Sequence, residues 1–409
     1  MDLVRVEIIE SPQRAGHARL CGDVAYDDRA ASPERYWFEV PREQAEALSL
    51  SGNAWLACLL PLAVTRREPL RIAAPVDRTL LNHAPELMRI WRSWYRHLTL
   101  VPIEAEPAPA SSLAPAGSHN AALFSGGVDS WFTVLRPREA EPSGGEDGRQ
   151  GIDDLLTVWG FDVPLDAHHA FARMADRFRR VAAELGRGFV SVATNLRATR
   201  WRQADWGGLA HGCALVASGL ALERRYGRLL IAATGGYRDL HPWGSHPLTD
   251  PLLSTATTTV AHDGAAFTRE QKLTLLAKSP MALRTLRVCW RSGTDENCGA
   301  CNKCYRTMVQ LELLGALDRC GTLPPGPVDL ERLSRVYCAY SWDFREFGDI
   351  QRLALERGRP DVARAAERAM RRSGRLAPRL ALARALRGRP LVWRWAETLE
   401  RRLLAGWVV

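Results

Sequence analysis

The sequence lacks any apolar run of the ~18 residues that a membrane-spanning helix needs, so we expect no membrane partner. Its start carries Asp2, Arg5 and Glu7 within the only apolar stretch there, which does not fit a secretory signal and predicts a cytoplasmic protein. Lysine is scarce, with three lysines among the 55 basic residues. Hydrophobic residues make up 46% and charged residues 25%, a balance that excludes a disordered chain.

The positive charge is concentrated at the end of the chain. From Gln351 onward there are 15 arginines and 5 acids, a net charge of +10, whereas the whole chain carries +9. The first 350 residues therefore carry a net charge of −1. Two interpretations stay open: a solvated arginine-rich helical surface, or a surface for a nucleic acid or another acidic partner.

A length of 409 residues predicts two or three domains. We expect an N-terminal α+β accessory domain at 1–104, followed by a linker rich in Pro, Ala and Ser at 105–118. An α/β domain is expected at 119–320 and an arginine-rich helical extension at 321–409. The oligomeric state is open, with a homodimer among the alternatives.

Strand-like and helix-like segments alternate from Asn120 onward. This alternation predicts an α/β fold with a parallel sheet and helices on both faces. Thr268 and Gln271 have the spacing of a capping box, which predicts a further helix from there. The expected strands are Ala121–Phe124, Leu155–Gly160, Phe189–Ala193 and Leu229–Ala233, and the expected helices are Asp166–Leu185 and Leu209–Tyr226.

The most specific local motif is the segment SGGVDS at Ser125–Ser130, between the first of these strands and a helix. Its two glycines allow a tight turn, and the helix start offers N–H groups and a positive dipole end to an anion. The hydroxyl groups of Ser125 and Ser130 add donors. Asp129 is unusual beside an anion, unless it orients the turn or helps to hold Mg²⁺. The segment matches neither a Walker A loop nor a dinucleotide-binding fingerprint.

Four of the nine cysteines lie within sixteen residues, at Cys289, Cys298, Cys301 and Cys304. Four thiolates at this spacing can form a closed tetrahedral zinc site, which is structural rather than catalytic. An iron–sulfur cluster is the main alternative, because C-x2-C-x2-C also suits such a cluster. Reactive thiols without metal are a further alternative.

The SGGVDS segment resembles the PP-loop of the ATP pyrophosphatase superfamily, whose signature is SGGxDS. The resemblance implies an adenine nucleotide alpha hydrolase-like fold, and a reaction that splits ATP into AMP and pyrophosphate. It also implies that the turn binds ATP through Ser125, Gly126, Gly127, Val128, Asp129 and Ser130, with Asp129 and Ser130 also in catalysis. The end of the second strand, with Gly160 and Phe161, corresponds to the position at which related enzymes place the adenine.

The turn and the cysteine spacing together resemble the 7-cyano-7-deazaguanine synthase family of queuosine biosynthesis, over roughly Asn120 to Leu317. This resemblance implies a small-molecule acid substrate, ammonia or an amine as nucleophile, and ATP, Mg²⁺ and Zn²⁺ as cofactors. It places Lys272 near the phosphates. The N-terminal domain and the arginine-rich extension depart from the family pattern, so the chain is better described as a relative of the synthase.

A Gly/Pro/His-rich loop follows the fourth strand and contains Arg238, His246 and Asp250. Because ligands of α/β proteins bind beside strand ends, we take these three as tentative substrate contacts. Two other functions stay open. One is an RNA-thiolating relative, in which Cys213 would be the only stray thiol available for catalysis. The other is a sensor that binds ATP without turning it over.

Overall fold

The computed structural model describes residues 1–28, 31–109, 117–136, 151–291, 294–387 and 393–408. The chain forms two compact units, one of residues 1–267 with 292–295 and the other of residues 268–291 with 296–409. Half of the predicted linker at 105–118, residues 110–116, lies outside the described residues, and residues 105–107 belong to a strand, Ile103–Pro107. The expected domain boundaries stay predictions.

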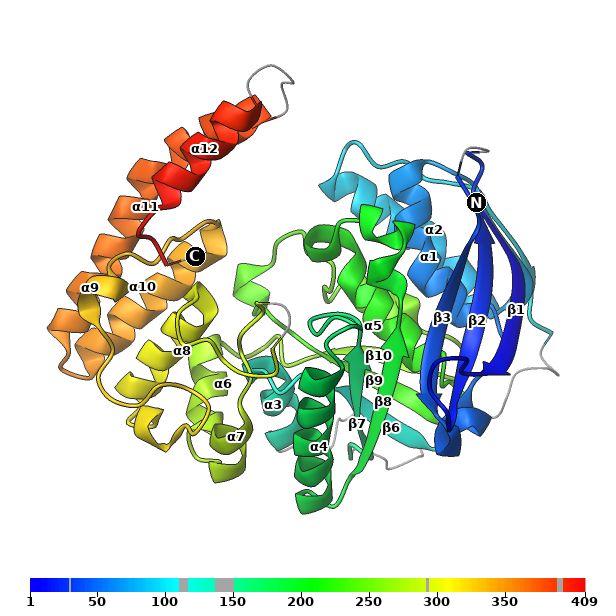
Figure 1. The fold of residues 1–409 in the computed structure, drawn as a ribbon, viewed down its shortest axis with the longest axis horizontal. Coiled ribbons are helices and arrows are strands. Elements are labelled where there is room, and N and C mark those ends of the chain that lie inside the picture. The colour runs from blue at the N-terminus through cyan, green and yellow to red at the C-terminus, as the bar shows by residue number, and fades with distance from the viewer. Residues whose placement is uncertain (29–30, 110–116, 137–150, 292–293, 388–392, 409) are drawn as a thin grey trace. The chain divides into compact units, whose positions relative to one another are not determined.

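The first unit contains a ten-stranded sheet (Figure 1). The strand order is β10-β9-β6-β7-β8-β3-β2-β1-β4-β5, and six of the nine neighbouring pairs are parallel. The expected α/β class with a mostly parallel sheet is therefore confirmed. The strands are β1 (Asp2–Glu10), β2 (His17–Ala25), β3 (Glu34–Pro41), β4 (Leu70–Val76), β5 (Ile103–Pro107), β6 (His119–Leu123), β7 (Asp154–Trp159), β8 (Gly188–Thr194), β9 (Tyr226–Ala232) and β10 (Thr259–Asp263).

The five strands β6 to β10 form the parallel half of the sheet. From β6 the chain moves outward through β7 to β8, and then crosses back to place β9 on the other side of β6. The strand order therefore reverses between β6 and β9. In open α/β sheets such a reversal opens a crevice at the carboxyl ends of the strands, and ligands bind there. This order is that of a Rossmann-like fold.

Helices cover both faces of the parallel strands, as expected. On one face, Phe124 packs against Trp131 of α3 (Val128–Leu135) and Phe178 of α4 (His168–Glu184). On the other face, alternate strand residues such as Leu123 and Val192 join one apolar core with α1 (Asn53–Arg66), α2 (Arg78–Trp94) and α5 (His211–Leu220). This alternation follows from the two-residue period of a strand.

The N-terminal strands do not form a sheet of their own. Strand β3 pairs antiparallel with β8, through Phe38 with Thr194 and Glu39 with Ala193. The first 107 residues thus extend the same sheet, and their helices α1 and α2 share its core. The expected N-terminal α+β segment is therefore a continuation of the α/β sheet, in the same compact unit.

The second unit is helical. The predicted capping box is confirmed: the Thr268 hydroxyl accepts from Gln271 N, and Gln271 Oε1 accepts from Thr268 N. Among the residues that the structure describes, no helix combines the length and apolarity needed to cross a membrane. The helices are α6 (Arg269–Leu276), α7 (Pro280–Thr285), α8 (Asn302–Leu313), α9 (Leu330–Leu333), α10 (Ser341–Glu356), α11 (Pro360–Arg387) and α12 (Trp393–Leu404).

Candidate functional site

The SGGVDS turn connects the carboxyl end of β6 to the first residue of α3. Gly126 adopts a left-handed conformation with φ of 74°, which favours glycine over every other residue. Gly127 is extended and is the N-cap of α3. Trp131 N donates to Gly127 O at 2.9 Å, and the N–H groups before it belong to the helix end that lacks intrahelical acceptors. The turn therefore presents backbone donors at a positive dipole end.

The hydroxyl groups of Ser125 and Ser130 make contacts within the turn. Ser130 Oγ donates to Gly127 O at 3.1 Å, and lies 3.4 Å from both Ser125 N and Ser125 Oγ. Ser130 is buried, whereas Ser125 is exposed. Asp129 lies half-buried in the first turn of α3. Ser125, Asp129 and Ser130 thus share one turn, and their contact with a ligand stays a prediction.

This turn lies at the reversal of strand order. Strand β6 ends at Leu123 just before the turn, and β9 ends at Ala232 just before Gly235 and Gly236. The two strands are parallel neighbours, so both segments emerge at the same edge of the sheet. An anion held at α3 would therefore lie in the crevice that this topology creates.

The end of β7 is a second glycine turn at the same edge. Gly160 has φ of 103°, and a Cβ there would lie 2.1 Å from Thr194 O, so no side chain fits. Phe161 is buried, and its carbonyl accepts from Arg197 Nη1 at 2.8 Å. The backbone of Gly160 and Phe161 is therefore held close to the end of β8.

A group of aromatic rings follows these strand ends. Phe161 and Trp206 have ring centroids 5.0 Å apart, and Trp206 and His211 5.8 Å apart. Trp243, in the loop after β9, lies 5.6 Å from His211 and 5.7 Å from His241. Segments after β7, β8 and β9 thus contribute flat rings to one cluster. Trp206 and Trp243 were not predicted from the sequence, although each is a tryptophan followed by glycine between two strands.

His211 begins α5 directly after one π-helical turn, Trp206–Ala210. Burial lowers the pKa of His211, so the ring is neutral near neutral pH. Its Nδ1 lies 2.9 Å from Trp206 O, a carbonyl that can only accept, so the proton sits on Nδ1 and Nε2 carries the lone pair. A neutral imidazole with Nε2 as acceptor can take up a proton.

The loop after β9 is fastened to the start of α5 by backbone bonds. Gly212 N donates to Gly244 O at 3.0 Å, and Gly244 N donates to Gly207 O at 2.8 Å. Within this loop Asp250 is fully buried and accepts from Ser245 Oγ at 2.6 Å and from His246 N at 3.1 Å. These bonds hold Trp243 against His211.

All three candidate substrate contacts lie in this loop, and two of them are buried. Besides its loop partners, Asp250 has Nδ1 of His262 at 2.7 Å. His246 is 5% exposed, packs edge-on against Trp94, and has its pKa lowered by burial. Arg238 is exposed and pairs with Asp239 at 3.1 Å. Asp250 and His246 thus anchor the loop, and a substrate contact by any of the three residues stays a prediction.

Two further residues singled out in the sequence, Lys272 and Cys213, are both buried. Lys272 is buried in α6 of the second unit, and its role stays a prediction. Cys213 is 2% exposed within α5, and burial raises its pKa well above the usual value. A thiol so buried is a poor nucleophile, because the thiolate is the reactive form. This observation weighs against the RNA-thiolating alternative.

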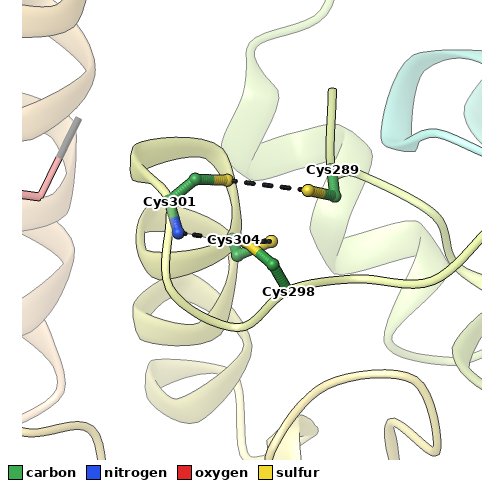
Figure 2. Close-up of side chains that lie close together, drawn as sticks. All are labelled: Cys289, Cys298, Cys301 and Cys304. Atoms are coloured by element: carbon green, nitrogen blue, oxygen red, sulfur yellow. Dashed lines mark hydrogen bonds between the residues drawn. The ribbon is translucent and has the colours of Figure 1, made fainter. Parts of the chain in front are cut away.

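The four clustered cysteines meet at the start of α8 in the second unit (Figure 2). All four Sγ atoms lie within 4.8 Å of one another, and the pairs Cys289–Cys301 and Cys298–Cys304 are each separated by 3.9 Å. A tetrahedral ion with Zn–S bonds of ~2.3 Å requires sulfurs about 3.8 Å apart. The cluster therefore fits one zinc ion, and this close spacing favours a single ion over an iron–sulfur cluster.

Backbone bonds preorganise this cluster. Ala300 N and Cys301 N donate to the Cys298 sulfur at 3.4 and 3.3 Å, which fixes the position of this sulfur beside the start of α8. Hydrogen bonding with Cys304 lowers the pKa of Cys301 to about 5, and the same bond raises that of Cys304. Of the four cysteines, Cys301 is therefore the one whose thiolate these hydrogen bonds favour.

Asn297 joins the two segments that carry the cysteines, and the sequence analysis missed it. Its Oδ1 accepts from Val288 N at 2.8 Å and Cys289 N at 3.0 Å, and its Nδ2 donates to Leu286 O at 2.8 Å. The only sequence signal is its position directly before Cys298. Arg306, two residues after Cys304, pairs with Glu346 of α10.

No family model matches this chain, and comparisons with curated proteins and with solved structures found no match.

Proposed function

We propose that this protein is an ATP-dependent ligase that forms AMP and pyrophosphate while activating a carboxylate or amide oxygen for attack by nitrogen. The observation that carries the proposal is the SGGVDS turn at the reversal of strand order between β6 and β9. A left-handed glycine, two serine hydroxyls and a helix start come together there. These are the groups that bind a chain of phosphates.

In this proposal the turn holds the phosphates of ATP, and Ser125, Gly126 and Gly127 contact them. The backbone turn at Gly160 and Phe161 supports the adenine. Asp129, in the first turn of α3, would supply a carboxylate to Mg²⁺, which when bound neutralises phosphate charge. Catalysis is then mainly the positioning of the phosphates and the stabilisation of their charge.

The chemistry has two transfers. A substrate oxygen attacks the α-phosphorus, the bond to the β-phosphate oxygen breaks, and pyrophosphate leaves. An amine or ammonia then attacks the activated carbon, AMP leaves with its oxygen, and the nitrogen releases a proton. His211 is suited to accept that proton, because it is neutral, its Nδ1 is bound to Trp206 O, and its ring lies against Trp206 and Trp243 from the segments after β8 and β9.

The resemblance to the 7-cyano-7-deazaguanine synthase family suggests the first substrate to test, a 7-carboxy-7-deazaguanine acid with ammonia. The fit of the four cysteines to one zinc ion supports this resemblance, because the family carries such a site. Zinc there would be structural, since four thiolates leave no open position.

The test incubates protein, ATP and Mg²⁺ with a panel of planar heteroaromatic acids and ammonia, and follows AMP, pyrophosphate and product mass. We expect AMP and pyrophosphate in equal amounts and one new product. Asp129→Ala should abolish both, whereas Asp176→Ala, at an exposed carboxylate that pairs with Arg179, should keep them. His211→Gln should retain exchange of labelled pyrophosphate into ATP but lose product.

Other outcomes identify the other functions. ADP and phosphate as products would overturn the proposed cleavage at the α-phosphorus. Tight ATP binding without turnover across the acid panel would favour the sensor. Sulfur transfer to RNA that depends on Cys213 would favour the thiolating relative.

A further inference from the structure

Five arginines form one straight row on α11, the long helix of the second unit. They are Arg364, Arg368, Arg371, Arg375 and Arg379. At 3.6 residues per turn, all five lie within about 80° of the helix circumference and span about 22 Å along its axis. We call this row the arginine row. Four of its members are exposed and Arg368 is half-buried.

The arginine row has no acidic partners. Among the described residues, no hydrogen bond or ion pair involves any of its five side chains, and Glu367, exposed beside the row, pairs with none of them. Other arginines of the same unit behave differently. Arg359 pairs with Glu312 at 2.7 Å and Asp361 at 2.9 Å, and Arg352 pairs with Glu270 at 2.5 Å. The row therefore concentrates uncompensated charge.

The opposite face of α11 is occupied. Ala366, Ala369 and Ser373 are fully buried, and the helix packs against α9, α10 and α12 of the same unit. Insertion into a lipid surface needs an apolar helix face turned outward. In α11 the continuous apolar face is buried in the helical unit. The exposed side carries the arginine row, with Leu382 as an exposed large apolar side chain further along the helix.

We propose that the arginine row binds the phosphate backbone of a nucleic acid. Nucleic acid presents a nearly continuous line of charge, about one per 1.7 Å of duplex axis, so five cations in a straight row along about 22 Å all find phosphates. An acidic protein would need carboxylates arranged in a matching row. Arginine suits this contact because its planar guanidinium binds phosphate through two donors.

The experiment measures binding of fluorescent 20-nucleotide RNA and 20-base-pair DNA to the full chain by anisotropy, without ATP, at 50 to 200 mM salt. For duplex DNA we expect log K to fall with log salt with a slope of about −4.5, that is about −0.9 for each of five contacts. Replacing Arg368, Arg371 and Arg375 by Ala should change the slope to about −2 and weaken binding at least about tenfold. The stronger of the two probes identifies the type of nucleic acid.

The matched control removes the same charge elsewhere. Its three arginines are exposed and ion-paired: Arg5 with Glu7, Arg89 with Glu86 and Arg179 with Asp176. Changing these three to Ala should leave affinity within about twofold, because each is already neutralised. Equal weakening by the control would overturn the proposal, as would absent binding at 50 mM salt. Equal competition by polyglutamate, or binding to anionic vesicles alone, would also overturn it.

Because the assay contains no ATP, its outcome is independent of the proposed ligase activity. Circular dichroism of the triple variant should match the native chain, since among the described residues no hydrogen bond or ion pair involves these three side chains and two of them, Arg371 and Arg375, are exposed. A folded variant with unchanged affinity contradicts the proposal directly.

Discussion

Thr133 of α3 donates a hydrogen bond of 2.7 Å from its hydroxyl to the carboxylate of Asp263, the last residue of β10. Both side chains are buried, and Arg136 pairs with the same carboxylate. Since α3 begins in the SGGVDS turn, this contact ties the orientation of the turn to the edge strand of the sheet. The direction in which the backbone N–H groups of the turn point thus depends on Asp263, which is 130 positions from Thr133 in the sequence.

Asp263→Ala should lower the free energy of unfolding by about 2 to 4 kcal/mol, because it leaves the Thr133 hydroxyl and the Arg136 guanidinium without their acceptor. Urea unfolding followed by tryptophan fluorescence measures the change. The control is Asp176→Ala, which removes an exposed partner of Arg179 and should cost about 0.5 kcal/mol or less. Equal losses in the two variants would contradict the buried role of Asp263.

Gly126→Ala should weaken ATP binding at least about tenfold, because a Cβ disfavours the left-handed backbone by about 1 to 2 kcal/mol and so disturbs the turn. The chain offers a matched control, Gly16, whose φ is 73° and around which a Cβ would meet nothing within 4 Å. Both variants carry the same backbone strain. Isothermal titration with ATP and Mg²⁺ distinguishes them, and equal ATP affinity in the two variants would remove the turn from the binding site.

The parallel half of the sheet could be predicted from the sequence because each element carries a local signal. The predicted strand Leu155–Gly160 lies within one residue of β7, and the predicted helix Asp166–Leu185 covers α4. By contrast, α1 is missing from the prediction. It is buried from Asn53 to Val64, so no polar face creates a helical period in its sequence.

The pairing of β3 with β8 could not be predicted, because the strand pattern of Phe38 and Glu39 does not specify its partner. The candidate sites likewise differ in how far the sequence predicts them. Four cysteines within sixteen residues predict a metal site from spacing alone, whereas Thr133 and Asp263 meet only through the topology of the sheet. The tryptophans beside His211 likewise come from separate loops.

Cys301→Ser should remove bound zinc and unfold the second unit, since binding of a structural metal contributes directly to folding. We expect about one zinc per chain in the native protein and close to none in the variant, by metal analysis after gel filtration. Cys320→Ser is the control, because Cys320 is equally buried but lies outside the cluster. A Cys301 variant that keeps its zinc and its melting temperature would contradict a structural role, and iron in the native protein would favour the cluster alternative.

Acidification should destabilise the first unit through its buried histidines. Burial lowers the pKa of His211 and of His246, so the folded chain takes up their protons less readily than the unfolded chain. The two neutral rings therefore stabilise the folded chain fully above pH ~6.5, the pKa of a histidine in the unfolded chain. This stabilisation is lost as the pH falls through the lower pKa values that the two rings have in the folded chain. The free energy of unfolding should decrease from pH 7.5 to 5.5.

His211→Gln should make that decrease smaller, because it removes one of the rings that become protonated at a higher pH in the unfolded chain than in the folded chain. Urea unfolding at pH 7.5, 6.5 and 5.5 measures the slope. His169→Gln, at an exposed histidine of α4, is the control and should leave the slope unchanged. A His211 variant with the native slope, or an imidazole resonance of His211 that titrates at or above pH 6.5, would show that burial does not disfavour the protonated ring and would remove its assignment as a neutral proton acceptor.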